Sequence, residues 1–198
     1  MRLILIRHGE SQSQRQGMPS SPSNCTGLTE RGFEQARALA DRFRETGELT
    51  GCQVLLSSPV KRAYQTAEIL KGVVSFEVYK EDFDLCAILQ GEVDDSFQKL
   101  YRSKYGEPIP PEGEGWEKFI DRARSTLHRL AAQFENQKVV AVSHAEFVVA
   151  SIVTLFGRSA HGTWLEPTNT GITEWGWSGG RWTLFRYNDA SHLLETDF

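Results

Sequence analysis

Two arginines and two histidines follow short apolar runs in the sequence. Arg7 and His8 directly follow the first run. Arg62 comes shortly after a second run, and His144 directly follows a third. Such runs are typical of buried strands, and ligands of open α/β sheets bind at the carboxyl ends of strands. Arginine matches phosphate oxygens with a charged donor fork, and histidine can act as a covalent nucleophile. These residues therefore predict one pocket for a doubly charged tetrahedral anion.

The elements that would position these residues alternate along the chain. Strands are predicted at residues 3–6, 54–59, 76–79 and 138–146. Helices are predicted at residues 33–46, 60–71, 94–105, 114–135 and 147–156. Two further strands, 171–177 and 181–188, would form a hairpin across Ser178-Gly179-Gly180. This order predicts a three-layer α/β/α sandwich with a mainly parallel central sheet and an antiparallel strand pair near the C-terminus, in one domain over residues 1–198.

Composition limits the classes of partner. The 198-residue chain has a net charge of −4, which gives no reason to expect nucleic acid or an anionic membrane as a partner. No apolar run approaches a membrane-spanning length, and no targeting segment is recognisable. Three separated cysteines, Cys25, Cys52 and Cys86, lack metal-ligand spacing and suit a reducing compartment. We therefore expect a cytoplasmic protein without a metal or other cofactor.

Each of three candidate site residues also has a purely structural alternative. His8 could be a strand-end histidine that a carboxylate satisfies. Arg62 could be an exposed helix residue, and His144 could be a buried core histidine after an apolar strand. Only the position of these residues in the fold can decide between the two interpretations.

Several motifs together resemble those of a known family. In order along the chain they are "LILIRHGES", "LTERGFEQA", "SSPVKRAYQTAEIL", "VSHAE" and "NDASHL", between residue 2 and about residue 193. They resemble the histidine phosphatase superfamily, the phosphoglycerate mutase-like proteins. The resemblance implies that His8 is the nucleophile that takes the phosphoryl group. It implies that Arg7 and Arg62 hold the phosphoryl oxygens, and that His144 stabilises the transferring group.

The sequence departs from this family pattern at the residue expected to protonate the leaving oxygen. Phosphatases of the family present a glutamate in this stretch, whereas "DLCAILQGE" carries Ala87 at the corresponding position. We favour Glu146, two residues after His144, as the proton donor. Ser143 and Glu146 also have the spacing of a helix capping box, which is a structural alternative for Glu146. The other candidate carboxylates are Glu81, Asp82, Asp84 and Glu92.

Other polar residues receive supporting roles. Gln14 could contact phosphate or simply belong to a loop. Glu10 is expected to support the His8 turn rather than react. His128, His161 and His192 are expected to be structural or surface residues.

The function predicted from these residues is metal-independent hydrolysis of phosphomonoesters through a phosphohistidine on His8. One alternative is a phosphotransferase of the phosphoglycerate mutase type. The other is a module that binds a phosphorylated ligand with weak or lost catalysis. In each case the expected partner is a small phosphorylated molecule, and the sequence predicts no oligomeric state.

Overall fold

A computed structural model describes residues 1–17, 22, 24–91, 93–157 and 165–193. The strands are β1 (Arg2–Arg7), β2 (Val54–Ser57), β3 (Val78–Glu81), β4 (Lys138–Ser143), β5 (Ile172–Ser178) and β6 (Arg181–Asp189). The helices are α1 (Gln12–Arg15), α2 (Glu30–Thr46), α3 (Lys61–Lys71), α4 (Asp95–Tyr105), α5 (Gly115–Gln133) and α6 (Ala145–Phe156), with a 3-10 turn at Phe83–Leu85. None of the described helices is long and apolar enough to cross a membrane.

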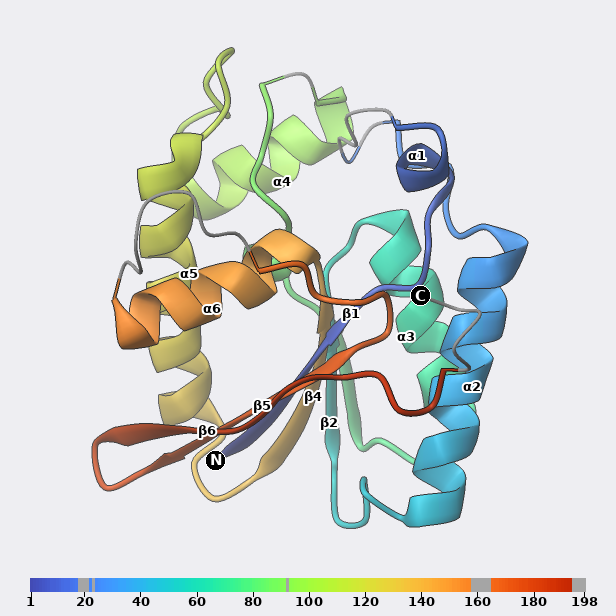
Figure 1. The fold of residues 1–198 in the computed structure, drawn as a ribbon. Helices are drawn as coiled ribbons and strands as arrows, with labels where there is room; N and C mark the ends of the chain where they lie inside the picture. The colour runs from blue at the N-terminus through green and yellow to red at the C-terminus, as the bar shows by residue number, and fades with distance from the viewer. Residues whose placement is uncertain (18–21, 23, 92, 158–164, 194–198) are drawn as a thin grey trace.

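The six strands form one mixed sheet in the order β3-β2-β4-β1-β5-β6 (Figure 1). The first four strands in this order, β3, β2, β4 and β1, run parallel to one another. Strand β5 is antiparallel to both β1 and β6. The hairpin between β5 and β6 turns at Gly179 and Gly180, both at positive φ. The predicted mainly parallel sheet with an antiparallel C-terminal pair is therefore confirmed.

Side chains of the central strands alternate between two apolar layers. In β1, Leu3 and Leu5 pack into the cluster that includes α5 and α6, whereas Ile4 and Ile6 pack into the cluster that includes α2 and α3. Strand β4 alternates in the same way. Both faces of these strands are buried, which explains their continuous apolar runs. Helices cover both faces of the sheet, as the three-layer prediction required (Figure 1).

Several local predictions differ from the structure, among them the strand predicted at residues 138–146, which ends at Ser143, and the helix predicted at 147–156, which begins at Ala145. The edge strand β3 begins at Val78 rather than residue 76, because its register is set by pairing Val78 with Val54 of β2. The strand predicted at residues 54–59 ends at Ser57, and α3 begins after its N-cap Val60. The four-residue helix α1 was not predicted, because it is too short to show a period. It is recognisable only from its capping box between Ser11 and Gln14.

Two motif glycines hold the turn after β1 against the start of α2. A Cβ atom on Gly9 would lie 2.4 Å from the backbone oxygen of Gly32, and one on Gly32 would lie 2.1 Å from the backbone oxygen of Glu10. The N-cap Thr29 accepts from the Gly32 amide at 3.0 Å and donates to the Glu10 carboxylate at 2.6 Å. Glu10 thus supports the His8 turn, and the two motifs pack as one backbone unit.

Candidate active site

The structure brings Arg7, His8, Arg62 and His144 together at the carboxyl edge of the parallel strands. These residues are called the cluster of four below. Arg7 is the last residue of β1 and pairs with Ser143, which directly precedes His144. The His8 and His144 rings lie 5.1 Å apart between centroids in an edge-on arrangement. All four side chains are buried, including Arg62 at 4% exposure. Arg62 is therefore not the exposed helix residue that its sequence context allowed.

The hydrogen bonds of His8 define which ring nitrogen carries the lone pair. Arg62 Nε can only donate, and it lies 2.9 Å from His8 Nε2, so this nitrogen is an acceptor. His8 Nδ1 then carries the hydrogen, which it donates to the Gly9 carbonyl at 2.7 Å. Burial, together with the positive charges of Arg62 and Arg7, lowers the pKa of His8 well below its usual value. His8 is therefore a neutral imidazole whose Nε2 lone pair accepts from Arg62.

Two buried nitrogens of the site lack a hydrogen-bond partner in the described part of the chain. They are Arg7 Nε and His144 Nδ1. Burial also lowers the pKa of Arg7, an effect that the nearby Glu166 carboxylate partly offsets. Unpaired buried polar groups are costly, so such groups in a native site call for a ligand or water. An anion with several oxygens would satisfy both nitrogens at once.

Glu146 lies in the first turn of α6, half-buried at the same edge of the sheet. Its charge raises the pKa of Arg7, so Glu146 acts electrostatically on one arginine of the site. The capping-box alternative is wrong, because the N-cap of α6 is His144 and no side chain caps it. The Ser143 hydroxyl donates instead to the Leu85 carbonyl at 2.6 Å. Glu146 therefore has no capping role to explain its position.

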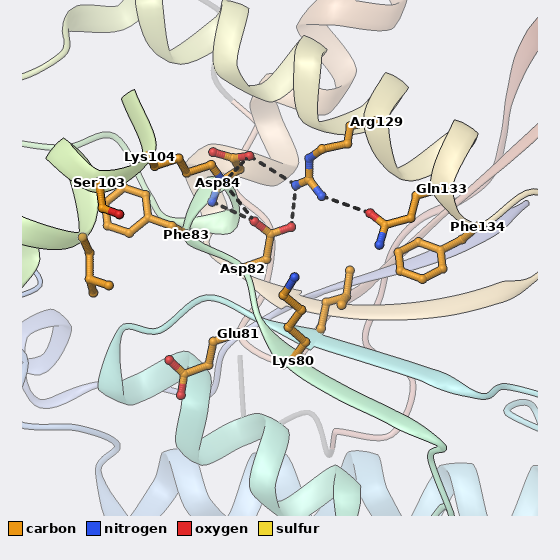
Figure 2. A pocket seen from close by; sticks show the side chains of 12 residues that line it. Lys80, Glu81, Asp82, Phe83, Asp84, Ser103, Lys104, Arg129, Gln133 and Phe134 are labelled. Carbon is orange, nitrogen blue, oxygen red and sulfur yellow. Dashed lines mark hydrogen bonds and ion pairs between the residues drawn. The ribbon is translucent and has the colours of Figure 1, made fainter. Parts of the chain in front are cut away.

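Two of the competing carboxylates, Asp82 and Asp84, are held in a separate ionic cluster (Figure 2). Asp84 lies 2.6 Å from Lys104 Nζ and 3.2 Å from Arg129 Nη2, and Asp82 pairs with the same two cations. Burial raises the pKa of Asp84, but hydrogen bonds from Lys104 and Tyr105 outweigh it and hold this pKa below its usual value. A carboxylate that stays ionised is poorly suited to donate a proton.

Of the two remaining competitors, Glu81 is the one that the described residues include, and its position is unfavourable. Glu81 is exposed at the end of β3, and its side chain points away from the ionic cluster in Figure 2. Glu92 lies outside the described residues. Ala87, at the position of the missing glutamate, is buried at 8% exposure and offers no proton.

A buried ion pair between Arg122 and Glu114 organises the loop that contains Ala87. Arg122 also donates to the main-chain carbonyls of Asp84, Cys86 and Ala87, at 2.7, 3.1 and 2.9 Å. Glu114 accepts from Arg122 through both carboxylate oxygens and from the Leu89 amide at 2.8 Å. The loop is thus fixed by two side chains of the α5 region rather than by regular secondary structure.

The Arg122→Met variant is expected to lower the free energy of unfolding by about 3–5 kcal/mol, because it leaves the buried Glu114 charge and three carbonyls without their donor. Urea denaturation followed by circular dichroism measures this loss. Arg124→Met is the matched control on the same helix, since Arg124 forms an exposed pair with Asp121. The control should cost less than about 1 kcal/mol. Equal losses in the two variants would contradict the stabilising role of the buried pair.

Sequence reasoning missed two residues that contact the site from the segment before β5. Glu166 Oε1 lies 3.0 Å from Arg7 Nη1, which also donates to the Pro167 carbonyl. Asn169 Nδ2 donates to the His8 carbonyl at 2.9 Å. No motif marks these residues. Their only signal is topological, because β5 runs antiparallel to β1 and so begins where β1 ends.

The structure also places the secondary candidates. The exposed Gln14 side chain accepts from the Ser11 amide in the capping box of α1. It also hydrogen-bonds to the side-chain amide of Asn169. His192 bonds to the Thr170 hydroxyl at 2.8 Å, and the Thr170 amide donates to the Arg7 carbonyl at 3.0 Å. His128 is exposed on α5 beside Trp177. His161 lies outside the described residues.

Comparison with known proteins gives a consistent result over nearly the whole chain. The family model described as histidine phosphatase superfamily (branch 1) matches residues 3–190. The uncharacterised phosphatase PhoE of Bacillus subtilis is 27% identical over 198 residues, which cover 96% of each chain. Phosphoserine phosphatase 1 of Hydrogenobacter thermophilus is 30% identical over 174 residues, or 83% of this chain and 80% of that protein.

A solved structure has the same fold. The phosphoserine phosphatase of Entamoeba histolytica, crystallised with 3-phosphoglyceric acid, superposes with a TM-score of 0.75 at 26% identity. The match covers 98% of this chain and 99% of that chain. It therefore includes the segments that carry the cluster of four residues described above.

Proposed function

We propose that this chain, a phosphomonoesterase that belongs to branch 1 of the histidine phosphatase superfamily, transfers the phosphoryl group of its substrate first to His8 and then to water. One observation carries the proposal. His8 is neutral, its Nδ1 hydrogen is held by the Gly9 carbonyl, and its Nε2 lone pair lies in a buried site with two arginines. A nucleophile with that geometry beside charges that bind phosphate is suited to phosphoryl transfer.

In the first step, His8 Nε2 attacks phosphorus in line with the leaving oxygen. The N–P bond forms as the P–O bond to the leaving group breaks, and the electron pair of that bond goes to the leaving oxygen. Arg62 must first exchange its hydrogen bond with His8 Nε2 for one with a phosphoryl oxygen. Arg7 and His144, each with an unpartnered buried nitrogen, supply further donors. The Gly9 carbonyl stabilises the imidazolium that forms.

Glu146 is proposed as the proton donor to the leaving oxygen. It must be protonated in the first step and becomes a carboxylate when it has given up its proton. In the second step a water molecule gives a proton back to Glu146 and attacks phosphorus, and the N–P bond breaks to return neutral His8. The reaction consumes one water and releases inorganic phosphate and an alcohol. General acid catalysis of this kind contributes about 10²–10⁴-fold.

The proposed substrate is a small phosphorylated molecule, which fits what the names of the relatives state for those proteins. We also propose a reducing compartment such as the cytoplasm, because Cys25, Cys52 and Cys86 are buried and unbridged. A phosphotransferase of the mutase type would share the first step and pass the phosphoryl group to an organic hydroxyl instead of water. The fate of the phosphoryl group therefore distinguishes the two activities.

The proposal is tested by trapping the phosphoenzyme. The protein is mixed with a ³²P-labelled phosphomonoester and quenched in alkali within its first turnovers. We expect label on the protein that is stable in alkali and lost in acid, followed by release of inorganic phosphate. The His8→Gln variant should carry no label. Turnover without a labelled protein, or acid-stable label, would contradict the phosphohistidine. Transfer of the label to an added alcohol instead of water would favour the mutase-type activity.

A further inference from the structure

The hydroxyl of Ser58 lies at the centre of a buried chain of polar contacts behind His144. Its Oγ is 2.9 Å from His144 Nε2, 3.3 Å from the Val60 amide nitrogen and 3.4 Å from Cys86 Sγ. Ser58, Cys86 and His144 are each completely buried. Bulk solvent does not reach these three side chains, and their hydrogen-bonding groups contact one another instead.

The direction of these hydrogen bonds follows from what each group can do. The Val60 amide can only donate, so Ser58 Oγ accepts from it. Burial raises the pKa of Cys86 to about 11, so its thiol keeps a hydrogen to donate to Ser58. The single hydrogen of the Ser58 hydroxyl remains, and imidazole nitrogen accepts it far better than thiol sulfur does. Ser58 therefore donates to His144 Nε2.

The protonation of the other ring nitrogen of His144, Nδ1, follows from this direction. Burial and the charge of Arg62 lower the pKa of His144 well below its usual value, so the ring is neutral and carries one hydrogen. With Nε2 accepting from Ser58, that hydrogen is on Nδ1. Nδ1 is the buried nitrogen that has no hydrogen-bond partner among the described residues. An N–H at this position can donate to a phosphoryl oxygen, whereas a lone pair there would repel it.

We propose that Ser58, supported by the Cys86 thiol, is a positioning residue that holds His144 as the Nδ1–H tautomer. The consequence for catalysis rests on the proposed function, in which His144 donates to the transferring phosphoryl group. The tautomer itself is a property of the resting protein and does not depend on any activity. In other sites, a hydrogen bond to one ring nitrogen of a functional imidazole sets its tautomer and its orientation.

The tautomer is measured directly by NMR on protein labelled with ¹⁵N in the histidine rings, with His144 assigned from the signals lost in His144→Gln. In the wild-type protein we expect a protonated Nδ1 and an unprotonated, hydrogen-bonded Nε2. Adding inorganic phosphate should shift the Nδ1 signals of His144. Wild-type protein with the hydrogen on Nε2 would overturn the proposal, and this outcome requires no variant to fold.

Variants then separate positioning from a merely structural role. Ser58→Ala should mix the two tautomers of His144 and lower kcat by about 10- to 100-fold, the loss expected for one misdirected donor to a developing charge. Ser57→Ala is the matched control, because Ser57 is equally buried and its hydroxyl donates to the Ser58 carbonyl rather than to His144. It should keep the wild-type tautomer and kcat. Cys86→Ser, which retains a donor to Ser58, should keep the tautomer too.

The two levels of the proposal fail in distinguishable ways. If Ser58→Ala lowers the thermal midpoint but keeps the Nδ1–H tautomer and the wild-type kcat, Ser58 is structural and the positioning role is rejected. If the tautomer responds as expected while no phosphohistidine forms in the wild-type protein, the proposed function fails and the hydrogen-bond chain stands.

Discussion

Replacing His8 with alanine is expected to lower the turnover of phosphomonoesters by about 10⁴–10⁶-fold, the range observed when a nucleophile that acts with its partners is removed. Without Nε2 no N–P bond can form, and the arginines are left to bind a substrate that cannot react. The protein should remain folded, because His8 follows the end of β1 and belongs to neither of the two apolar clusters that cover the sheet. Steady-state turnover and circular dichroism measure the two effects.

His128→Ala is the matched control for this prediction. His128 is an exposed histidine on α5 whose ring packs against Trp177 and Trp182, so its loss should leave turnover within about twofold. Retention of more than a tenth of wild-type turnover by the His8 variant would exclude His8 as the nucleophile.

The depressed pKa of His8 also has a consequence for pH dependence. A lowered pKa means that His8 stays neutral as the pH falls through the usual histidine range near 6.5. The rate of phosphorylation in single turnovers should therefore not decline between pH 7 and about pH 5.5 through protonation of His8. A fall that follows one group of ordinary histidine pKa would contradict this assignment.

Replacing Glu146 with glutamine is expected to slow phosphorylation by alkyl phosphates by about 10²–10⁴-fold and by p-nitrophenyl phosphate by far less. An alkoxide is a poor leaving group and needs the proton fully, whereas p-nitrophenolate is stabilised without it. Glutamine keeps the size and polarity of the side chain, so the difference between the two esters reports the contribution of proton donation alone. The measurement is the single-turnover rate on both esters, together with its pH dependence, because an acid must be protonated to act.

Glu166→Gln is the control for an effect of charge alone. Glu166 also lies beside Arg7, so its removal should change phosphate binding by a similar factor for both esters. If Glu146→Gln likewise produces one uniform change, Glu146 acts through the charge it places near Arg7 and is not the proton donor. With Asp82 and Asp84 paired with Lys104 and Arg129, the search would then move to residues outside the described part of the chain.

Local periodicity was enough to determine the main elements of this fold. Buried parallel strands appear as continuous apolar runs, and the apolar residues of the covering helices recur with a period of 3.6 residues. Both kinds of element can therefore be predicted from short stretches of sequence. The strand ends then placed Arg7, His8 and His144 at one edge, because parallel strands expose their carboxyl ends together. The edge strand β3 was displaced by two residues because its register depends on its partner β2 and not on its own composition.

Interactions between distant segments were decided only by the tertiary structure. Sequence spacing allowed Ser143 to cap α6, but the Leu85 carbonyl lies within reach of its hydroxyl and takes the hydrogen bond. Asp82 and Asp84 were open candidates until Lys104 and Arg129 were placed beside them from α4 and α5.

The residues that surround Arg7, His8 and His144 also come from segments that are distant in the sequence. Glu166 and Asn169 meet Arg7 and His8 across about 160 positions of the sequence. Ser58 faces His144 only because β2 pairs with β4. Residue type and spacing along the chain determine which groups are available for chemistry. The direction of each hydrogen bond and the charge state of each buried group depend on neighbours that only folding brings within reach.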